Sequence, residues 1–189
     1  SLLIASIALT SACQSMSSSE SENISKMETD KPTAEMHAEK KNNDQLFEVH
    51  KDGRIYVFYD YAAYQYFLKL GHTPYVLTKI GAGPKGETIV YALTSDDKAK
   101  REGIVSVDMM EGRIAPAEDF YAEINMDGRT YVFNRLKDMS DVRKLGEAPF
   151  RYAKIGYGKN GESVVFVLND TNKTVYPEAL IKKYDDLNK

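Results

Sequence analysis

Asp52-Gly53-Arg54-Ile55-Tyr56-Val57-Phe58 sets the pattern for the folded part of the chain. It recurs 75 residues later as Asp127-Gly128-Arg129-Thr130-Tyr131-Val132-Phe133. The alignment of residues 48–95 with residues 123–170 needs no gap and contains 19 identical pairs in 48. This agreement far exceeds chance, and it indicates a tandem duplication inside the chain.

Each copy shows the pattern of a β-hairpin, a helix and a second β-hairpin. Asp52-Gly53 and Asp127-Gly128 separate runs of β-forming residues, which is typical of a tight hairpin turn. Apolar side chains then recur at every third position, which predicts a helix with one core-facing stripe. The stripe residues are Tyr61, Tyr64, Phe67 and Leu70 in the first copy, and Leu136, Met139, Val142 and Leu145 in the second. Gly71 and Gly146 follow directly, where a helix C-terminus favours a left-handed residue.

These patterns predict an α+β fold built from two tandem ββαββ units, each with an antiparallel sheet and one helix. A unit of 48 residues buries little core alone, so the two units are expected to pack together about a pseudo-twofold axis. In the connecting segment, residues 104–107 and 112–114 are expected to form a short hairpin. The predicted organisation is a signal peptide (1–12), a disordered tether (13–44), the first repeat (45–95), a connector (96–122), the second repeat (123–176) and a C-terminal helix (177–189).

The charge of the chain is unevenly distributed. Residues 14–45 contain seven acids and four lysines, which accounts for the whole formal charge of −3. The remainder is balanced and lacks the basic face that nucleic acid or anionic lipid would require. Nucleic acid is therefore not an expected partner.

The N-terminal segment indicates export. Residues 2–12 form an apolar run of 11 residues that ends in small side chains, as in a secretory signal, and is too short to span a bilayer. Leu9-Thr10-Ser11-Ala12-Cys13 resembles the lipobox of bacterial lipoproteins. The resemblance implies that Cys13 is lipidated and anchors the protein in the cell envelope, at the periplasmic face of the outer membrane in a Gram-negative host. The alternative is an ordinary cleaved signal in which Cys13 is incidental.

The segment after Cys13 is rich in Ser, Glu, Lys and Asn and contains no aromatic residue, so it is predicted to be a disordered tether. Met27, Met36 and His37 within it are residue types that bind copper. Copper handling in the envelope is therefore an alternative function, and a plain tether without metal is the simpler interpretation. No cofactor is predicted.

Gly53-Arg54-Ile55-Tyr56-Val57-Phe58, followed by a helix and by Pro74-Tyr75, resembles YHS-type modules. Those modules run Gly-x-x-Tyr-x-Phe, a helix and Pro-x-x-Tyr, and they are often tied to metal handling. The cysteines and the Tyr-His-Ser signature that would bind the metal are absent here. The resemblance therefore implies a shape and no ligand residue.

Polar residues that are identical in both copies are the first candidates for a ligand site. Among them are Asp52/Asp127, Arg54/Arg129, Lys79/Lys154 and Glu87/Glu162. Arg54 and Arg129 are preferred, because guanidinium groups recognise carboxylates in a planar, bidentate way. The alternative is a structural role, such as a capped turn or a cross-strand Lys–Glu pair.

Two tyrosines, Tyr59 and Tyr66, are expected off the core stripe, where they would suit a glycan or protein partner. Packing is the alternative for both. His50 and His72 are interpreted as exposed surface residues, and no catalytic residue is assigned. The leading hypothesis is a lipid-anchored envelope protein that presents a non-catalytic binding domain to an envelope protein or a glycan. A hydrolase built on Asp52 or Glu87 is the remaining alternative.

Overall fold

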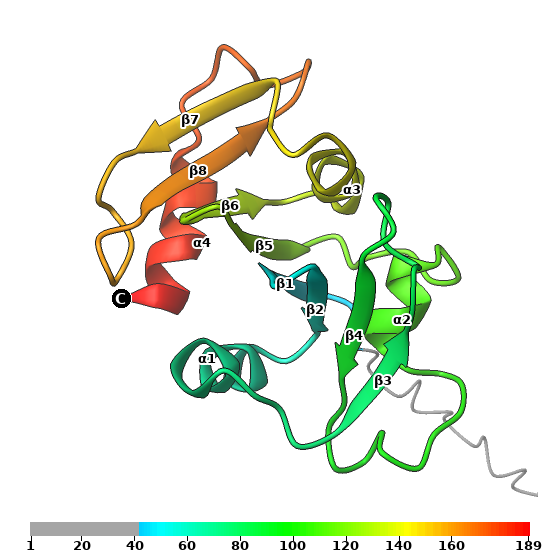
Figure 1. Cartoon of the computed structure of the whole chain (residues 1–189). Coiled ribbons are helices and arrows are strands. Elements are labelled where there is room, and N and C mark those ends of the chain that lie inside the picture. The colour runs from blue at the N-terminus through cyan, green and yellow to red at the C-terminus, as the bar shows by residue number, and fades with distance from the viewer. Residues whose placement is uncertain (1–41) are drawn as a thin grey trace, which may run out of the picture. The chain divides into compact units, whose positions relative to one another are not determined.

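The computed structural model describes residues 42–189 (Figure 1). They form eight strands, which make up one sheet, and four helices. No helix in this part of the chain is long and apolar enough to cross a membrane. The elements in chain order are β1 (Gln45–Lys51), β2 (Arg54–Phe58), α1 (Tyr61–Leu70), β3 (Val76–Lys79), β4 (Thr88–Ala92), α2 (Val105–Met110), β5 (Tyr121–Met126), β6 (Arg129–Phe133), α3 (Leu136–Leu145), β7 (Phe150–Lys154), β8 (Ser163–Leu168) and α4 (Glu178–Asn188).

The sheet is a single mixed sheet of eight strands in the order β3-β4-β2-β1-β5-β6-β8-β7. The hairpin pairs β1–β2, β3–β4, β5–β6 and β7–β8 are antiparallel. Three further pairs, β1–β5, β2–β4 and β6–β8, are parallel.

The predicted fold, a pseudo-twofold tandem of antiparallel ββαββ units with one helix each, is therefore wrong. The chain forms one continuous mixed sheet, and α2 is a helix where the prediction placed a hairpin, whereas α4 lies within the predicted C-terminal helix 177–189. Local patterns predict that a strand exists, but they do not show which strand it will pair with. One signal was available, because β4 and β8 are continuous apolar runs, as expected for strands that pair in parallel inside a sheet.

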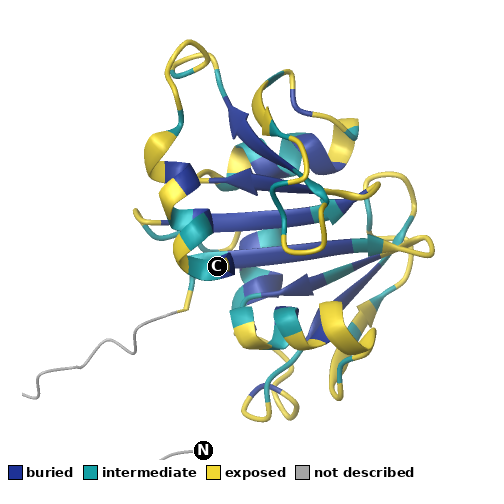
Figure 2. Cartoon of the chain, turned by 90° about the vertical axis from the view of Figure 1, so that its left-hand side faces the viewer, coloured by how far each residue is buried: buried dark blue, intermediate teal, exposed yellow. Residues whose placement is uncertain are grey.

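Helices cover both faces of the sheet. Figure 1 shows α1 and α4 on one side and α2 and α3 on the other, and we call these the α1/α4 face and the α2/α3 face. Leu46 packs on the α2/α3 face and Phe47 on the α1/α4 face, as the alternation of side chains along a strand requires. The central strands β1 and β5 are consequently buried on both sides, and exposed residues gather in the loops and on the outer sides of the helices (Figure 2).

The helices α1 and α3 bury less of their apolar stripe than predicted. The last stripe residues, Leu70 and Leu145, are 48% and 66% exposed. A spacing of three residues falls 60° short of a full turn, so the first and fourth positions point in opposite directions. The buried residues are the middle two of each stripe: Tyr64, Phe67, Met139 and Val142.

The hairpin predicted across residues 104–114 is also wrong. Residues Val105–Met110 form α2, which buries Val107 and Met109 against the α2/α3 face. Val105 and Val107 favour strands, but this preference is worth no more than about 1 kcal/mol, and burial of one helical face overrides it.

Candidate functional site

The two arginines proposed from the sequence do not share a cleft. Arg54 donates a hydrogen bond to the Tyr56 hydroxyl on the α1/α4 face (3.5 Å), and Arg129 bonds to Tyr131 on the α2/α3 face. Both begin strands at the same end of the sheet, but β1 and β5 lie between those strands, which separates them by about 14 Å. Both guanidinium groups are exposed and pair with a neighbouring tyrosine on their own strand.

The proposed tyrosines differ in their surroundings. Tyr59 is half-buried, donates a hydrogen bond to Asp97, and lies 3.2 Å from the Thr94 hydroxyl. Burial, together with the Asp97 carboxylate, raises the pKa of Tyr59 to about 12. Tyr66 is 45% exposed and meets the His72 ring edge-on at 5.5 Å between centroids. Of these two tyrosines, Tyr66 is the one that is exposed to a partner.

Cys13, Met27, Met36 and His37 lie outside the described residues. Among residues 42–189, no group of three or more His, Cys, Asp or Glu side chains could hold a metal ion.

The identical acids of the two β-hairpin loops have structural roles. Glu87 and Glu162 each accept a hydrogen bond from a backbone N–H of their own loop, at 2.7 Å and 2.9 Å. Asp52 and Asp127 occupy positive-φ turn positions at 52° and 53°. These contacts and conformations hold the turns and loops in place.

Three cavities flank α3, and the smallest, about 300 Å³, lies beside Ser140, Arg143 and Lys144. The largest, about 740 Å³, lies between α2 and α3 and includes Met109, Phe120 and Leu136 in its wall. The second, about 330 Å³, lies where the start of α3 meets the end of β8.

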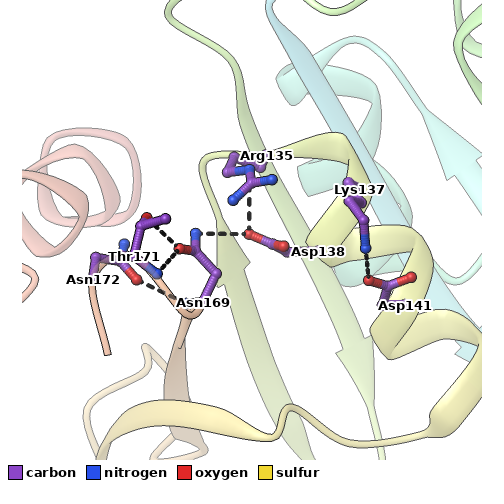
Figure 3. Close-up of polar contacts among 7 residues, drawn as sticks. All are labelled: Arg135, Lys137, Asp138, Asp141, Asn169, Thr171 and Asn172. Atoms are coloured by element: carbon purple, nitrogen blue, oxygen red, sulfur yellow. Dashed lines mark hydrogen bonds and ion pairs between the residues drawn. The ribbon is translucent and has the colours of Figure 1, made fainter. Parts of the chain in front are cut away.

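The polar groups of the second cavity are already paired with one another (Figure 3). Asp138 accepts a hydrogen bond from Asn169 at 3.3 Å, and Asn169 accepts from the Thr171 hydroxyl at 2.6 Å. Lys137 pairs with Asp141 at 2.6 Å. These contacts tie the end of β8 to α3, and they leave few free groups for a ligand.

The most informative polar residues are two buried glutamates that the sequence analysis did not select. Glu48 in β1 and Glu123 in β5 are 0% and 1% exposed. They stand at equivalent positions of the two aligned segments and are identical. Identity of an acidic residue at paired positions is the signal in the sequence, although both glutamates lie inside β-forming runs.

Glu48 lies on the α2/α3 face and is neutralised by the protein itself. Its Oε1 accepts hydrogen bonds from Nε (2.7 Å) and Nη2 of Arg143 in α3, and its Oε2 lies 3.0 Å from Nε2 of His50. Burial alone would raise the pKa of Glu48, but attraction by Arg143 and the hydrogen bonds from His50 and Arg143 hold it below its ordinary value. His50, predicted to be an exposed surface residue, has a side chain only 16% exposed.

Glu123 lies on the opposite, α1/α4 face and is surrounded by neutral donors. Its Oε1 accepts hydrogen bonds from the Tyr121 hydroxyl (2.5 Å) and from Nδ2 of Asn188 (2.8 Å). Its Oε2 accepts from the Tyr64 hydroxyl (2.8 Å), which in turn accepts from Nδ2 of Asn125 (2.7 Å). No Lys, Arg or His in residues 42–189 forms an ion pair with it. Burial therefore raises the pKa of Glu123, although these hydrogen bonds and the more distant charge of Lys159 oppose the shift.

A cavity of about 230 Å³ opens beside Glu123, and we call it the Glu123 cavity. Its wall is formed by α1, β5, β6, the loop between β7 and β8, and α4. The lining residues are Tyr64, Gln65, Leu68, Lys69, Glu123, Asn125, Thr130, Lys159, Asn160, Glu162, Tyr184 and Asn188. The cavity therefore joins a buried carboxylate to amide, hydroxyl and ammonium groups, which is the composition of a site for a polar ligand.

The tyrosines beside Glu123 serve as hydrogen-bond donors. Burial and the nearby Glu123 carboxylate raise the pKa values of Tyr64 and Tyr121 well above the ordinary value. Both hydroxyls thus keep their protons at neutral pH, and they hold the carboxylate rather than act as bases.

Replacing Glu123 by Gln is expected to change the pH dependence of stability. A carboxyl whose pKa is raised in the folded state costs stability as pH rises from its unfolded pKa, about 4.3, to its folded pKa. The free energy of unfolding of Glu123→Gln relative to wild type should therefore increase with pH across that window, by about 1.4 kcal/mol per pH unit. Urea denaturation at a series of pH values measures this difference. The exposed Glu118→Gln is the control, and a flat difference for Glu123→Gln would contradict the prediction.

Comparisons of the chain with protein-family models, with curated proteins and with solved structures found no match in any of the three.

Proposed function

We propose that the chain is a lipid-anchored binding protein of the bacterial cell envelope, whose folded part takes a small polar ligand without transforming it. The Glu123 cavity is the observation that supports this function most directly. It places a carboxylate, held rigidly by Tyr64, Tyr121 and Asn188, at the wall of a cavity of about 230 Å³. Rigid, pre-oriented polar groups lower the entropic cost of binding.

A binding role is favoured over catalysis by the chemistry around the cavity. Nucleophilic catalysis needs a nucleophile with a general base beside it. The hydroxyls nearest to Glu123 belong to tyrosines with raised pKa values, and Thr130 donates its hydroxyl to Asn125 at 3.3 Å. The groups present are therefore suited to hydrogen-bonding a ligand.

The envelope anchor rests on the N-terminal segment. The apolar run of residues 2–12 and the lipobox-like residues that end at Cys13 support lipidation. A chain with several acyl groups at Cys13 would stay on a membrane through the burial of their CH₂ groups. The binding domain would then act at the membrane surface.

The test has two arms. In thermal-shift measurements on the purified protein, at least one compound from a panel of amino acids, monosaccharides, dicarboxylates and polyamines is expected to raise Tm and to be recovered unchanged. Leu68→Trp should abolish this shift by filling the Glu123 cavity, whereas Leu145→Trp on α3 should not. A panel with no effect would overturn the binding function.

Separately, expression in a Gram-negative host should place the protein in the detergent phase, and Cys13→Ser should move it to the aqueous phase; equal partition of both proteins would overturn the anchor.

A further inference from the structure

We infer that the ligand of the Glu123 cavity is a small zwitterion, an α-amino acid or a molecule of the same charge pattern. Its ammonium group lies against Glu123, and its carboxylate points toward Lys69 and Lys159. This inference names the ligand class for the proposed binding function and rests on it.

The two buried glutamates differ in one decisive respect, which is the presence of a cation in direct contact with the carboxylate. Arg143 in α3 neutralises Glu48. The equivalent position in α1 is Leu68, which lines the Glu123 cavity. The protein therefore supplies a guanidinium group to one buried carboxylate and leaves a cavity beside the other.

An ammonium group of a ligand can supply what Glu123 lacks. A carboxylate has about four acceptor positions, and Glu123 uses three, two on Oε1 and one on Oε2. A buried carboxylate without a cation is costly, so a charge-assisted hydrogen bond to the remaining position is strongly favoured.

The rim of the cavity carries the opposite charge. Lys69 and Lys159 are exposed lining residues, and within residues 42–189 neither forms an ion pair or a hydrogen bond through its side chain. The other charged lining residue, Glu162, is engaged with the backbone N–H of Asn160. The site thus presents a buried carboxylate inside, and at its rim two ammonium groups that outnumber the single carboxylate of Glu162. Neither lysine forms an ion pair within residues 42–189, and Lys159 attracts Glu123 only at longer range. This arrangement matches a molecule with an ammonium at one end and a carboxylate at the other.

The volume limits the size of this molecule. About 230 Å³ is below the range of roughly 300–1,000 Å³ that is typical of sites for drug-sized ligands. A single amino acid fits this limit, whereas a peptide would have to extend into solvent.

Calorimetric titration of the purified full chain tests the inference. The probe is the standard L-amino acid that raises Tm most, compared with its N-acetyl derivative and its methyl ester. We expect the N-acetyl derivative to bind more weakly by a factor of about 30 or more, because the buried charge pair is lost. The ester should bind about two- to fivefold more weakly, because the lost contacts are exposed.

Variants assign these losses to residues. Glu123→Gln should abolish the discrimination against the N-acetyl derivative, and the double variant Lys69→Gln/Lys159→Gln should abolish the discrimination against the ester. Lys144→Gln is the matched control, because Lys144 is the equivalent of Lys69 in α3 and lies outside the Glu123 cavity. Circular dichroism checks that each variant is folded. If Glu123→Gln does not fold, the affinities of wild type and of the lysine variants for the amino acid, its N-acetyl derivative and its methyl ester still decide the outcome.

The outcomes separate the two proposals. Equal binding of the amino acid and both derivatives, or binding of a neutral sugar in preference to any amino acid, overturns the inference that the ligand is a zwitterion. The proposed binding function would still stand. A protein that binds no compound of the wider panel overturns the binding function itself.

Discussion

Replacing Arg143 by Met is expected to lower the free energy of unfolding by about 3–5 kcal/mol at neutral pH. The variant leaves the carboxylate of Glu48 fully buried and without the cation that neutralises it. The net contribution of a buried ion pair is smaller than this figure, because desolvation offsets the attraction between the charges. Removing one partner leaves the other charge buried and unpaired, and that penalty dominates. Urea denaturation of both proteins measures the loss.

Three comparisons make the Arg143 prediction specific. Arg135→Met, at the N-cap of the same helix but 46% exposed in its pair with Asp138, should cost less than about 1 kcal/mol. The double variant Glu48→Gln/Arg143→Met should regain most of the lost stability, because no buried charge remains. A loss below about 1 kcal/mol for Arg143→Met would show that Glu48 is neutralised in another way.

The pH dependence of the Arg143→Met loss has a definite sign. The pKa of Glu48 is lowered in the folded state, so the ionised carboxyl contributes stability above its unfolded pKa of about 4.3, and this stability is lost as pH falls through the folded pKa. The cost of Arg143→Met should therefore shrink in acid.

Truncating Tyr64 to Ala is expected to cost about 3–5 kcal/mol, the range for loss of a large buried aromatic residue. The Tyr64 side chain is fully buried and stacks on Phe47, with ring centroids 4.6 Å apart and an angle of 14° between the planes. The change opens a space in the core of the α1/α4 face. It also removes the donor to Oε2 of Glu123 and the acceptor for Asn125.

Tyr64→Phe separates the ring from the hydroxyl. It keeps the stacking, and it should cost about 1–3 kcal/mol because a buried carboxylate oxygen and an amide lose a partner. Tyr66→Ala, on the same helix but exposed, is the control and should change the free energy of unfolding by no more than about 0.5 kcal/mol. Equal stability of Tyr64→Phe and wild type would show that the hydrogen bond to Glu123 contributes little.

The buried site could be predicted from the sequence only in part. Tyr64 was expected in the core as a member of an apolar stripe, and the identity of Glu48 and Glu123 was visible in the alignment. Their partners were not, because Arg143 is 95 residues from Glu48, and Asn188 is 65 residues from Glu123. No spacing rule relates residues so far apart in the chain.

What the sequence determined by itself is local. The Asp-Gly pairs form turns at positive φ, and Gly71 and Gly146 end their helices in the left-handed region at φ values of 77° and 89°. These outcomes depend only on backbone sterics of the residues concerned, so they can be recognised without knowledge of the fold.

Tertiary structure alone decided the order of the strands, the helical state of residues 105–110 and the partners of the two buried glutamates. Identical residues on the two central strands project to opposite faces of one sheet, where α3 presents an arginine to Glu48 and α1 presents a leucine and a cavity near Glu123. The physical reason is that burial and charge compensation depend on which elements meet across a face. That meeting is set by the free energy of the whole packed sheet rather than by any segment of it.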